Sequence, residues 1–513
     1  MEQTESLILV ITNTVTYIEG KITPELYSAI KEELSYVPED AAFRIQQIKR
    51  TRNYSWDGRI YLIHREKKWC KCPLPKDGTH FPTGLFGKIR KLFTENNISY
   101  KVIDKRVKPD KNLILEMSKE VEIRDYQEEA AEVSVKQTRA ILQAATGSGK
   151  NCIGARIIQK CGVSPFIFYV PSVDLLKQSQ AELSRFLLQN GTNLKVGAIG
   201  GGIYDPADVN VMTIQTAVRA CGKEYIRFDE EDEDESKEGI CVLEEKRKEI
   251  LDLIMNAKGF ILDECHVAAS ESVQIIADYS VNAYFRILMS ATPFRDKNDD
   301  ILIEACAGKV SINITASFLI KLGYLVKPNI YFVSHTPAQT ESQTYPSIYK
   351  EAIVENIERN NIIAKLALRM AENGSNVLIL VQQIAHGKIL KELIPDSVFL
   401  YGANSGKERY KHLEKMRGSE SRITISSVIF DIGIDVRSLD TLILCGSGKS
   451  STRALQRIGR TLRPYTNPIT GVKKEFSTVI DFEDHCKYLL QHSRKRKSIY
   501  RTESEFAIDY LQT

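Results

Sequence analysis

The stretch "AILQAATGSGKNCIGARIIQK", Ala140 to Lys160, decides the fold of this 513-residue chain. It reads as an apolar strand, a glycine-rich loop and a helix with apolar residues on one face. Glycines let the backbone N–H groups of such a loop turn toward a phosphate, and the dipole of the following helix favours negative charge. A strand-to-helix turn can be merely structural, but the Gly-Ser-Gly-Lys ending favours a nucleotide site in which Lys150 reaches the β and γ phosphates. The loop residues predicted to bind the nucleotide are Thr146, Gly147, Ser148, Gly149, Lys150 and Asn151.

The residue after Lys150 departs from the usual form of such a loop. A Ser or Thr normally follows the lysine, because its hydroxyl holds the magnesium of the bound nucleotide. Here the residue is Asn151. Its amide oxygen can ligate magnesium in principle, but the side chain is longer and neutral, it brings an NH₂ donor close to the cation, and magnesium tolerates little geometric error. We therefore expect a site that forms but turns over poorly, and a natural variant and an engineered change fit this pattern equally.

Length and composition describe an ordinary globular protein of about three domains. Hydrophobic residues make up 43% and charged residues 27% of the chain. No apolar run approaches the ~18 residues of a membrane helix, and the apolar N-terminus lacks a basic start, so it predicts a strand and no membrane partner. The ten cysteines are scattered, with Cys70 and Cys72 the one close pair. Reduced thiols in the cytoplasm are a simpler interpretation than a zinc site.

The net charge of +4 conceals an uneven layout. The acidic run 229–238 predicts a disordered, solvated loop. The basic tail 493–501 and the basic, aromatic stretch 44–59 each allow two interpretations, phosphate contact or a solvated surface.

From about residue 141 onward, short apolar runs alternate with helical stretches, which indicates parallel sheets covered on both faces. The runs are AILQA, PFIFYV, NVMTI, GFILD and FRILMS, then NVLILV, SVFLY, RITIS, DTLILC and STVIDF. Residues 315–328 split them into two sets. The predicted α/β domains span 116–318 and 319–513, after a smaller α+β domain over 1–115.

Three further motifs bear on the chemistry. "GFILDECH" ends a strand with Asp263, which can hold magnesium, and Glu264, which can orient an attacking water. Helix capping is the alternative for Asp263 alone. "MSATP" follows the next strand, and "QRIGRTLR" places Arg460 and Arg463 three residues apart, on one face of a helix. These arginines are placed to stabilise charge on a phosphate held by the other α/β domain, although a solvated basic face is the common alternative.

In this order the motifs resemble those of the superfamily 2 helicases. "RDYQ" (124–127) looks like the adenine-reading motif, "ATGSGKN" motif I, "DECH" motif II, "SAT" motif III, "ISSVIFDIGIDV" motif V and "QRIGRTLR" motif VI. The resemblance implies two tandem RecA-like domains that bind ATP and Mg²⁺ in the cleft between them. It implies catalytic roles for Lys150, Asp263, Glu264, Gln456, Arg460 and Arg463, nucleotide contacts from Arg124, Gln127, Gly433 and Asp435, and magnesium ligands in Asn151 and Asp263.

The same resemblance implies a path for nucleic acid. "YVPSVDLLKQ" is similar to motif Ia and "MTIQTA" to motif Ib, both of which touch the nucleic-acid backbone in the family. The residues placed on the strand in this way, together with those after motif III and in motif V, are Pro171, Gln215, Thr216, Phe294, Arg295 and Ser427.

The N-terminal sequence narrows the substrate. "RNYSWDGRIYLI" and "FPTGLFGKIRKLF" resemble the accessory domain of phage UvsW-type helicases, which rewind and branch-migrate forked DNA. This resemblance implies a substrate of branched or forked DNA with single-stranded segments. We expect a monomer in the cytoplasm, which is the host's if a phage encodes the chain. Arg52 and Arg59, with Lys88, Arg90 and Lys91, are expected at phosphates. Trp56 either stacks on a base or is a core residue.

Two alternatives stay open. One is an RNA-directed helicase of the same fold, although "DECH" in place of Asp-Glu-Ala-Asp and the N-terminal sequence favour DNA. The other is a hydrolysis-deficient DNA clamp, which Asn151 supports and the intact Glu264, Arg460 and Arg463 oppose.

Overall fold

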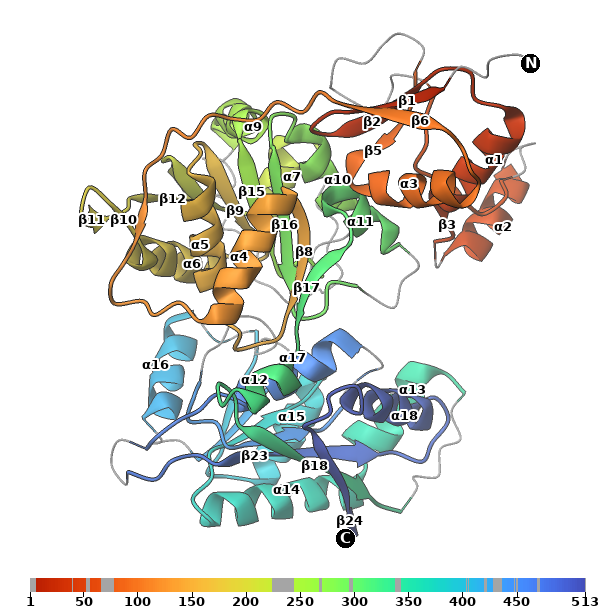
Figure 1. The fold of residues 1–513 in the computed structure, drawn as a ribbon. Helices are drawn as coiled ribbons and strands as arrows, with labels where there is room; N and C mark the ends of the chain where they lie inside the picture. The colour runs from red at the N-terminus through yellow and green to blue at the C-terminus, as the bar shows by residue number, and fades with distance from the viewer. Residues whose placement is uncertain are drawn as a thin grey trace. The chain divides into compact units, whose positions relative to one another are not determined.

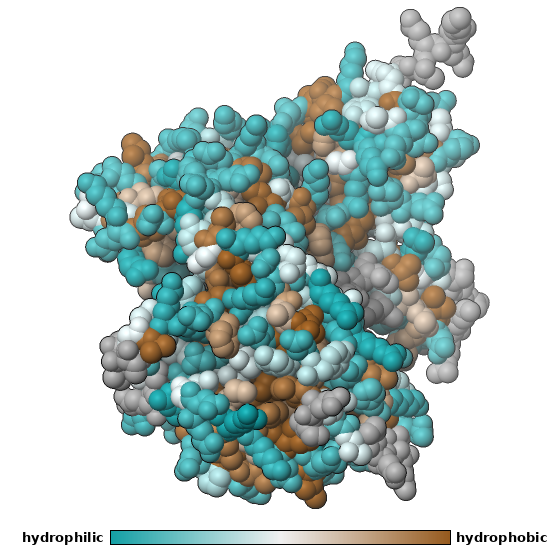
Figure 2. All heavy atoms as spheres, turned by 60° about the horizontal axis from the view of Figure 1, so that its bottom comes forward, coloured by the Kyte–Doolittle hydropathy of each residue, from teal (hydrophilic) through white to brown (hydrophobic). Residues whose placement is uncertain are grey.

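The chain forms two compact units, one built mainly from residues before Ile314 and the other from Ile314 onward. The computed structural model describes residues 6–38, 40–51, 56–65, 78–223, 244–266, 270–294, 299–336, 343–402, 404, 406–418, 422–427, 436–446, 448, 451–467 and 471–512. Within these ranges, no helix combines the length and the apolar character needed to cross a bilayer. The face drawn in Figure 2 is mostly hydrophilic, with hydrophobic groups scattered among the polar ones.

The first unit is centred on an eight-stranded sheet with the order β13-β12-β14-β9-β15-β16-β8-β17. Neighbours from β12 to β8 pair in parallel, and β13 pairs antiparallel with β12. The strands are β8 (Arg139–Ala144), β9 (Phe166–Val170), β12 (Val196–Gly200), β13 (Ile203–Asp205), β14 (Val209–Thr213), β15 (Gly259–Asp263), β16 (Phe285–Ser290) and β17 (Val310–Ile314). The five apolar runs predicted here are β8, β9, β14, β15 and β16, so the parallel sheet is confirmed.

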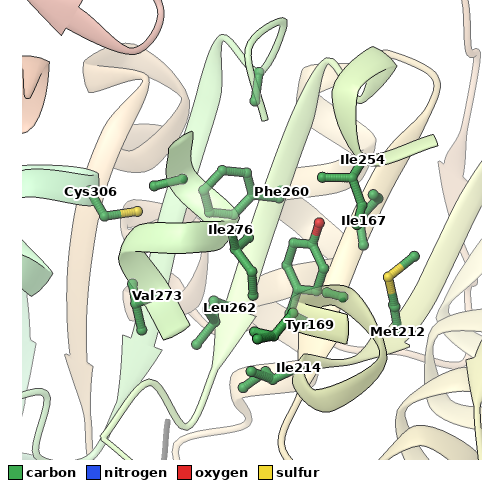
Figure 3. Packing of buried hydrophobic residues seen from close by; sticks show 14 of the residues in the cluster. Ile167, Tyr169, Met212, Ile214, Ile254, Phe260, Leu262, Val273, Ile276 and Cys306 are labelled. Carbon is green, nitrogen blue, oxygen red and sulfur yellow. The ribbon is translucent and has the colours of Figure 1, made fainter. Parts of the chain in front are cut away.

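Helices cover both faces of this sheet (Figure 1). They are α4 (Asp125–Gln137), α5 (Lys150–Cys161), α6 (Val173–Phe186), α7 (Ile214–Ala220), α9 (Arg247–Asn256), α10 (Ser270–Tyr279) and α11 (Ile301–Ala307). On one face, Ile254 of α9 and Ile276 of α10 belong to the same buried cluster as Tyr169 and Phe260 of the sheet (Figure 3). Every residue of β9 and β15 is buried, which explains why these strands read as continuous apolar runs.

The second unit holds a seven-stranded sheet with the order β20-β21-β19-β22-β23-β18-β24, in which every neighbouring pair is parallel. The strands are β18 (Lys327–Ser334), β19 (Val377–Leu380), β20 (Val398–Leu400), β21 (Ile423–Ser426), β22 (Thr441–Leu444), β23 (Phe476–Glu483) and β24 (Ala507–Gln512). The helices are α12 (Ala316–Lys321), α13 (Tyr345–Tyr349), η3 (Lys350–Val354), α14 (Ile357–Glu372), α15 (Ile384–Leu393), α16 (Gly406–Arg417), α17 (Ser451–Thr461) and α18 (Leu489–Tyr500). All five apolar runs predicted in this half are strands, and the predicted pair of parallel-sheet domains is confirmed.

The basic tail 493–501 lies largely in α18, and one of its arginines has a structural role that neither interpretation of the sequence foresaw. Arg496 donates from Nε and Nη2 to the two carboxylate oxygens of Asp481, each over 2.8 Å, and both side chains are almost fully buried. Tyr500 also donates to Asp481 over 2.9 Å. The buried carboxylate of β23 therefore holds α18 against the sheet, and Arg496 is neither solvated nor available to a phosphate.

The N-terminal region is the small α+β element that the sequence predicted. Its four-stranded sheet has the order β5-β2-β1-β6, and β3 and β4 form a separate antiparallel pair. The elements are β1 (Leu7–Ile11), β2 (Val15–Glu19), α1 (Pro24–Glu33), β3 (Ser35–Tyr36), α2 (Ala41–Thr51), β4 (Ile60–Tyr61), β5 (Thr79–Pro82), η2 (Thr83–Leu85), α3 (Phe86–Glu95) and β6 (Tyr100–Asp104). A second small sheet, β11-β10-β7, joins β7 (Glu116–Met117), β10 (Leu187–Gln189) and β11 (Thr192–Asn193).

The N-terminal region packs directly on α11 of the first unit. Leu302 and Ala305 of α11 belong to the N-terminal hydrophobic cluster. A Cβ at Gly84 would lie 2.2 Å from the carbonyl oxygen of Glu304, so only glycine allows this approach. Lys88, expected at a phosphate, instead lies 3.0 Å from the Glu304 carboxylate. The region is therefore fixed to the sheet-bearing part of its unit by apolar contact, close backbone packing and an ion pair.

Candidate nucleotide site

The glycine loop connects β8 to α5 at the carboxyl end of the sheet. β8 ends at Ala144 and α5 begins at Lys150. Gly147 and Gly149 have φ angles of +89° and +79°, a region that residues with a Cβ rarely adopt. A Cβ at Gly149 would also lie 2.5 Å from Nε2 of Gln127. The two glycines thus let the loop turn, and the second also lets it approach the helix that carries Gln127.

The carboxylate pair predicted at the end of β15 faces the loop lysine. Lys150 Nζ donates to Glu264 Oε1 over 2.5 Å, and both side chains are mostly buried. Glu264 has a φ of +49°, which is uncommon for a residue with a side chain. The backbone N–H of Glu264 donates to Asp263 Oδ1 over 2.9 Å, and this bond supports the turn. The structure therefore brings together Lys150, Asp263 and Glu264.

His266 links this pair to the serine of "MSATP". Its Nδ1 lies 3.2 Å from Glu264 Oε2 and 2.8 Å from Ser290 Oγ at the end of β16. Ser290 Oγ also accepts the backbone N–H of Thr292 over 3.1 Å. β15, β16 and β8 are neighbours in the sheet, so their carboxyl ends form one continuous set of polar contacts. His266 and Ser290 lie in motifs that the sequence shows, but no role was predicted for either side chain.

The pKa values of the two carboxyls of the pair are shifted in opposite directions, although burial raises both. Burial raises the pKa of Asp263; the positive charge of Lys150 counteracts the rise, and the charges of Glu264 and Glu182 add to it. For Glu264, burial is outweighed by the Lys150 charge and the hydrogen bond from His266, so its pKa lies below the ordinary value. Glu264 is thus held as a carboxylate, the form that orients a water molecule as an acceptor.

Asn151 lies in the first turn of α5 and contacts α6. Its Nδ2 donates to Glu182 Oε2 over 2.8 Å and lies 3.4 Å from Ser179 Oγ. Glu182 holds the NH₂ group on the α6 side, and the expectation that this group lies close to a cation stays a prediction. Glu182 lies 31 residues beyond Asn151 in the chain and belongs to no motif, so no sequence signal pointed to it.

Arg124 and Gln127 lie at the N-terminus of α4. The backbone N–H of Arg124 donates to Gln127 Oε1 over 3.1 Å, and Arg124 Nη1 donates to the Tyr126 hydroxyl over 3.0 Å. Gln127 is only 4% exposed and lies against Gly149, as described above. The structure thus places these two predicted nucleotide residues beside the loop, and their contact with the base remains a prediction.

The residues predicted on nucleic acid have mixed surroundings. Pro171 follows β9, and Gln215 and Thr216 begin α7, with all three buried. The Thr216 hydroxyl lies 2.8 Å from that of Thr213, and its backbone N–H is capped by the same Thr213 oxygen over 3.3 Å. Phe294 packs against the buried cluster of the first unit. A contact between any of these four residues and nucleic acid would therefore involve the backbone more than the side chain.

The other residues predicted to contact nucleic acid lie in the N-terminal region, after β21, or outside the described part of the chain. Trp56 is half-buried and donates from Nε1 to the Arg59 carbonyl over 2.8 Å, while Arg59 is exposed. Ser427 follows β21 and is 1% exposed. The predictions for Arg52, Arg295, Gly433 and Asp435, and those for the acidic run and for Cys70 and Cys72, fall outside the described residues.

In the second unit, Gln456 and Arg460 lie on α17, Gln456 buried and Arg460 half-buried. The prediction that Arg460 and Arg463 share one helix face is wrong, because α17 ends at Thr461. Pro464 disfavours the helical conformation in the residue before it, which is Arg463. Buried Lys474 caps this end of the helix, because its Nζ donates to the Thr461 carbonyl over 2.6 Å.

Comparisons with known proteins identify two families and several relatives of the chain. Residues 120–295 match the family "Type III restriction enzyme, res subunit", and residues 358–465 match "Helicase conserved C-terminal domain". The chain is 25% identical over 497 residues to ATP-dependent DNA helicase uvsW of Enterobacteria phage T4, covering 88% of this chain and 90% of that protein. It is 25% identical over 417 residues to DNA 3'-5' translocase XPB2 of Sulfurisphaera tokodaii, covering 73% and 85%. A fragment of a putative HsdR subunit of a type I restriction enzyme from Vibrio vulnificus shares the fold, with a TM-score of 0.52 at 16% identity over 76% of this chain and 68% of that one.

The two parallel sheets and the two family matches define an ATP-dependent motor with tandem RecA-like domains. Residues 120–295 and 358–465 thus carry superfamily 2 helicase domains. Within that class the chain resembles the UvsW helicase of phage T4 along nearly its whole length.

Proposed function

We propose that the chain is an ATP-dependent DNA helicase or translocase that remodels branched DNA by fork regression, branch migration and unwinding. The observation that carries the proposal is the continuous contact from Lys150 through Glu264 and His266 to Ser290. It joins the phosphate loop, the carboxylate pair and the "SAT" motif at the ends of three neighbouring strands. DNA is favoured over RNA because the phage and archaeal relatives are named as a DNA helicase and a DNA translocase.

The residues present fit ATP with Mg²⁺. The described residues hold no group of three or more His, Cys, Asp or Glu side chains that could bind a metal ion. Magnesium at a nucleotide needs only one or two protein ligands, and it takes its other ligands from phosphates and water. The carboxylate of Asp263 and the amide oxygen of Asn151 are hard oxygen donors of this kind. When bound, the cation neutralises charge on the β and γ phosphates.

Each protein side chain has a separate task in the proposed reaction. Lys150 leaves Glu264 to bind the phosphates, and Glu264, ionised and held by His266, orients the attacking water. The release of Glu264 from Lys150 changes the contacts of His266 and Ser290. Nucleotide binding thereby affects the "SAT" segment through these two residues. Arg460 and Arg463 of the second unit are proposed to stabilise charge on the transferring phosphate.

The N-terminal region is proposed to recognise the DNA branch. Trp56 and exposed Arg59 offer a stacking surface and a phosphate contact side by side. The region is also firmly attached to the first unit through α11, so a force on the DNA would reach the motor. We further propose that the protein acts as a monomer in the cytoplasm of the host cell. Light scattering of the pure protein tests the monomeric state.

The test of this function is ATP-dependent regression of a model DNA fork, followed by gel electrophoresis of labelled strands. The parent protein is expected to regress the fork with ATP and Mg²⁺ and to lose this activity in EDTA. Trp56→Ala should impair regression and spare phosphate release stimulated by single-stranded DNA. Phe43→Ala, which removes another exposed aromatic of the same region, should leave both activities at the parent level.

Other results of the same test contradict the proposal. A clear preference for RNA over the matched DNA substrate would favour the RNA-directed alternative. Tight binding to the fork without any DNA-stimulated phosphate release would favour the clamp that Asn151 suggested.

A further inference from the structure

Glu182 of α6 makes two hydrogen bonds, one with each carboxylate oxygen. Oε2 accepts from Asn151 Nδ2 over 2.8 Å, and Oε1 accepts from Gln178 Nε2 over 3.0 Å. Gln178 lies one helical turn before Glu182, so it fixes the carboxylate from within α6. Asn151 is the residue that replaces the usual Ser or Thr of the phosphate loop, and both its side chain and that of Glu182 are partly buried.

This contact determines which end of the Asn151 amide faces the nucleotide. A carboxylate accepts hydrogen bonds and donates none, whereas the amide has a donor end and an acceptor end. The nitrogen must therefore face Glu182, because a flipped amide would place its oxygen against a carboxylate oxygen. Since the amide group is planar, its oxygen then points away from Glu182.

We infer that Glu182 is a positioning residue that makes Asn151 usable as a magnesium ligand, by holding the amide nitrogen on α6 and leaving Oδ1 for the cation. The inference rests on the proposed ATPase function, and it assigns Glu182 no direct contact with the cation. A hydroxyl can turn either a lone pair or its proton to suit its partner, so the usual Ser or Thr needs no such orientation. An asparagine at this position does need it.

A purely structural bond between α5 and α6 is the competing explanation. Such a bond would stabilise the loop whether or not a cation is present, and it would matter equally with any residue at position 151. The positioning role predicts the opposite on both counts. Removing Glu182 should affect nucleotide binding only when magnesium is present, and only while residue 151 is an asparagine.

The experiment is equilibrium binding of a fluorescent ADP analogue to the full chain, in Mg²⁺ and in EDTA, with four proteins. They are the parent, Glu182→Ala, Asn151→Thr and the double variant. Glu182→Ala should weaken binding in Mg²⁺ by about tenfold or more, the usual loss when a group that orients a metal ligand is removed. Binding in EDTA should be unchanged. In the Asn151→Thr background the same substitution should have little effect, so the two changes are strongly non-additive.

A matched control is Gln178→Ala, which removes the other partner of Glu182 and keeps the bond to Asn151. It should retain most of the magnesium-dependent affinity. Equal losses from Glu182→Ala in both backgrounds, or a loss that persists in EDTA, would overturn the positioning role and establish the structural one. No loss at all would overturn both. A parent protein that binds the analogue equally weakly with and without Mg²⁺ would overturn the proposed ATPase function itself, a result distinct from the others.

Discussion

Replacing Glu264 with Gln should separate nucleotide binding from hydrolysis. The substitution keeps the shape of the side chain and removes the charge that Lys150 and His266 face, at 2.5 Å and 3.2 Å. A nucleotide that recruits Lys150 to its phosphates must compete with this ion pair. We therefore expect the variant to bind ATP at least as tightly as the parent, while hydrolysis falls because the amide no longer orients the attacking water as a carboxylate does.

The structure sets the size of both effects. The Lys150 and Glu264 side chains are only 12% and 20% exposed, so solvent screens their attraction weakly. A charge-assisted hydrogen bond contributes about 1.5–3 kcal/mol. In the variant Lys150 stays charged and only its acceptor becomes neutral, so only part of this energy is lost. The free energy needed to separate Lys150 from residue 264 therefore falls by about 1 kcal/mol, which corresponds to roughly fivefold tighter ATP binding. Loss of a group that handles the proton and water of the reaction lowers the rate by about 10²–10⁴-fold.

Two assays measure these quantities, equilibrium binding of ATP and steady-state phosphate release at saturating forked DNA. Glu128→Gln is the matched control, since it makes the same chemical change in a carboxylate that pairs with Arg156 on the outer part of α5. It should leave turnover near the parent value. Parent-like turnover in Glu264→Gln would refute the assigned role of Glu264, and weaker ATP binding would refute the competition with Lys150.

Three other outcomes are expected. Arg460→Ala and Arg463→Ala should each lower ATP hydrolysis by roughly 10³-fold with strand binding intact in fluorescence anisotropy; lost binding with normal hydrolysis would place them on the nucleic acid. Gly84→Ala should lower stability by about 1–3 kcal/mol or more, seen as a lower melting temperature, because its Cβ would lie 2.2 Å from a backbone oxygen. Gly87→Ala, whose Cβ would meet nothing within 4 Å, should not. Burial lowers the pKa of His386 to about 3, so below about pH 6.5 the unfolded chain binds a proton that the folded chain does not. The free energy of unfolding should therefore fall from pH 7 toward pH 3, by up to about 1.4 kcal/mol per pH unit. Urea denaturation of His386→Gln should show a shallower fall.

The ten predicted strands were recoverable from sequence because both sheets are parallel and covered on both faces. Their strands are then buried in every position and largely apolar, as in β9 and β15. The strands that were not predicted lack that signature. β12 reads "VGAIG", with two glycines, and β17 reads "VSINI", with polar residues and only its last residue buried. Such strands form because their neighbours offer partners, and a single stretch of sequence does not show its neighbours.

The candidate site divides in the same way. Lys150, Asp263 and Glu264 were predictable because each motif fixes a side chain to the end of one strand, and parallel strands bring their ends together. The role of Glu182 was not, because its contact with Asn151 depends on how α6 packs against α5. The end of α17 was misjudged because spacing alone suggested a helix face, while Pro464 limits how far the helix extends.

The attachment of the N-terminal region decides how its role can be tested. Removing residues 1–110 would uncover Leu302 and Ala305 of α11, which are 5% and 3% exposed. It would also remove the Asn13 carbonyl that half-buried Arg139 of β8 contacts. Loss of fork activity in such a truncation would therefore follow from a damaged motor as readily as from lost recognition. A surface substitution such as Trp56→Ala leaves this packing in place, so a loss of fork regression with normal single-strand-stimulated hydrolysis would be assigned to recognition, and parent-like regression would make the region a stabiliser of the motor.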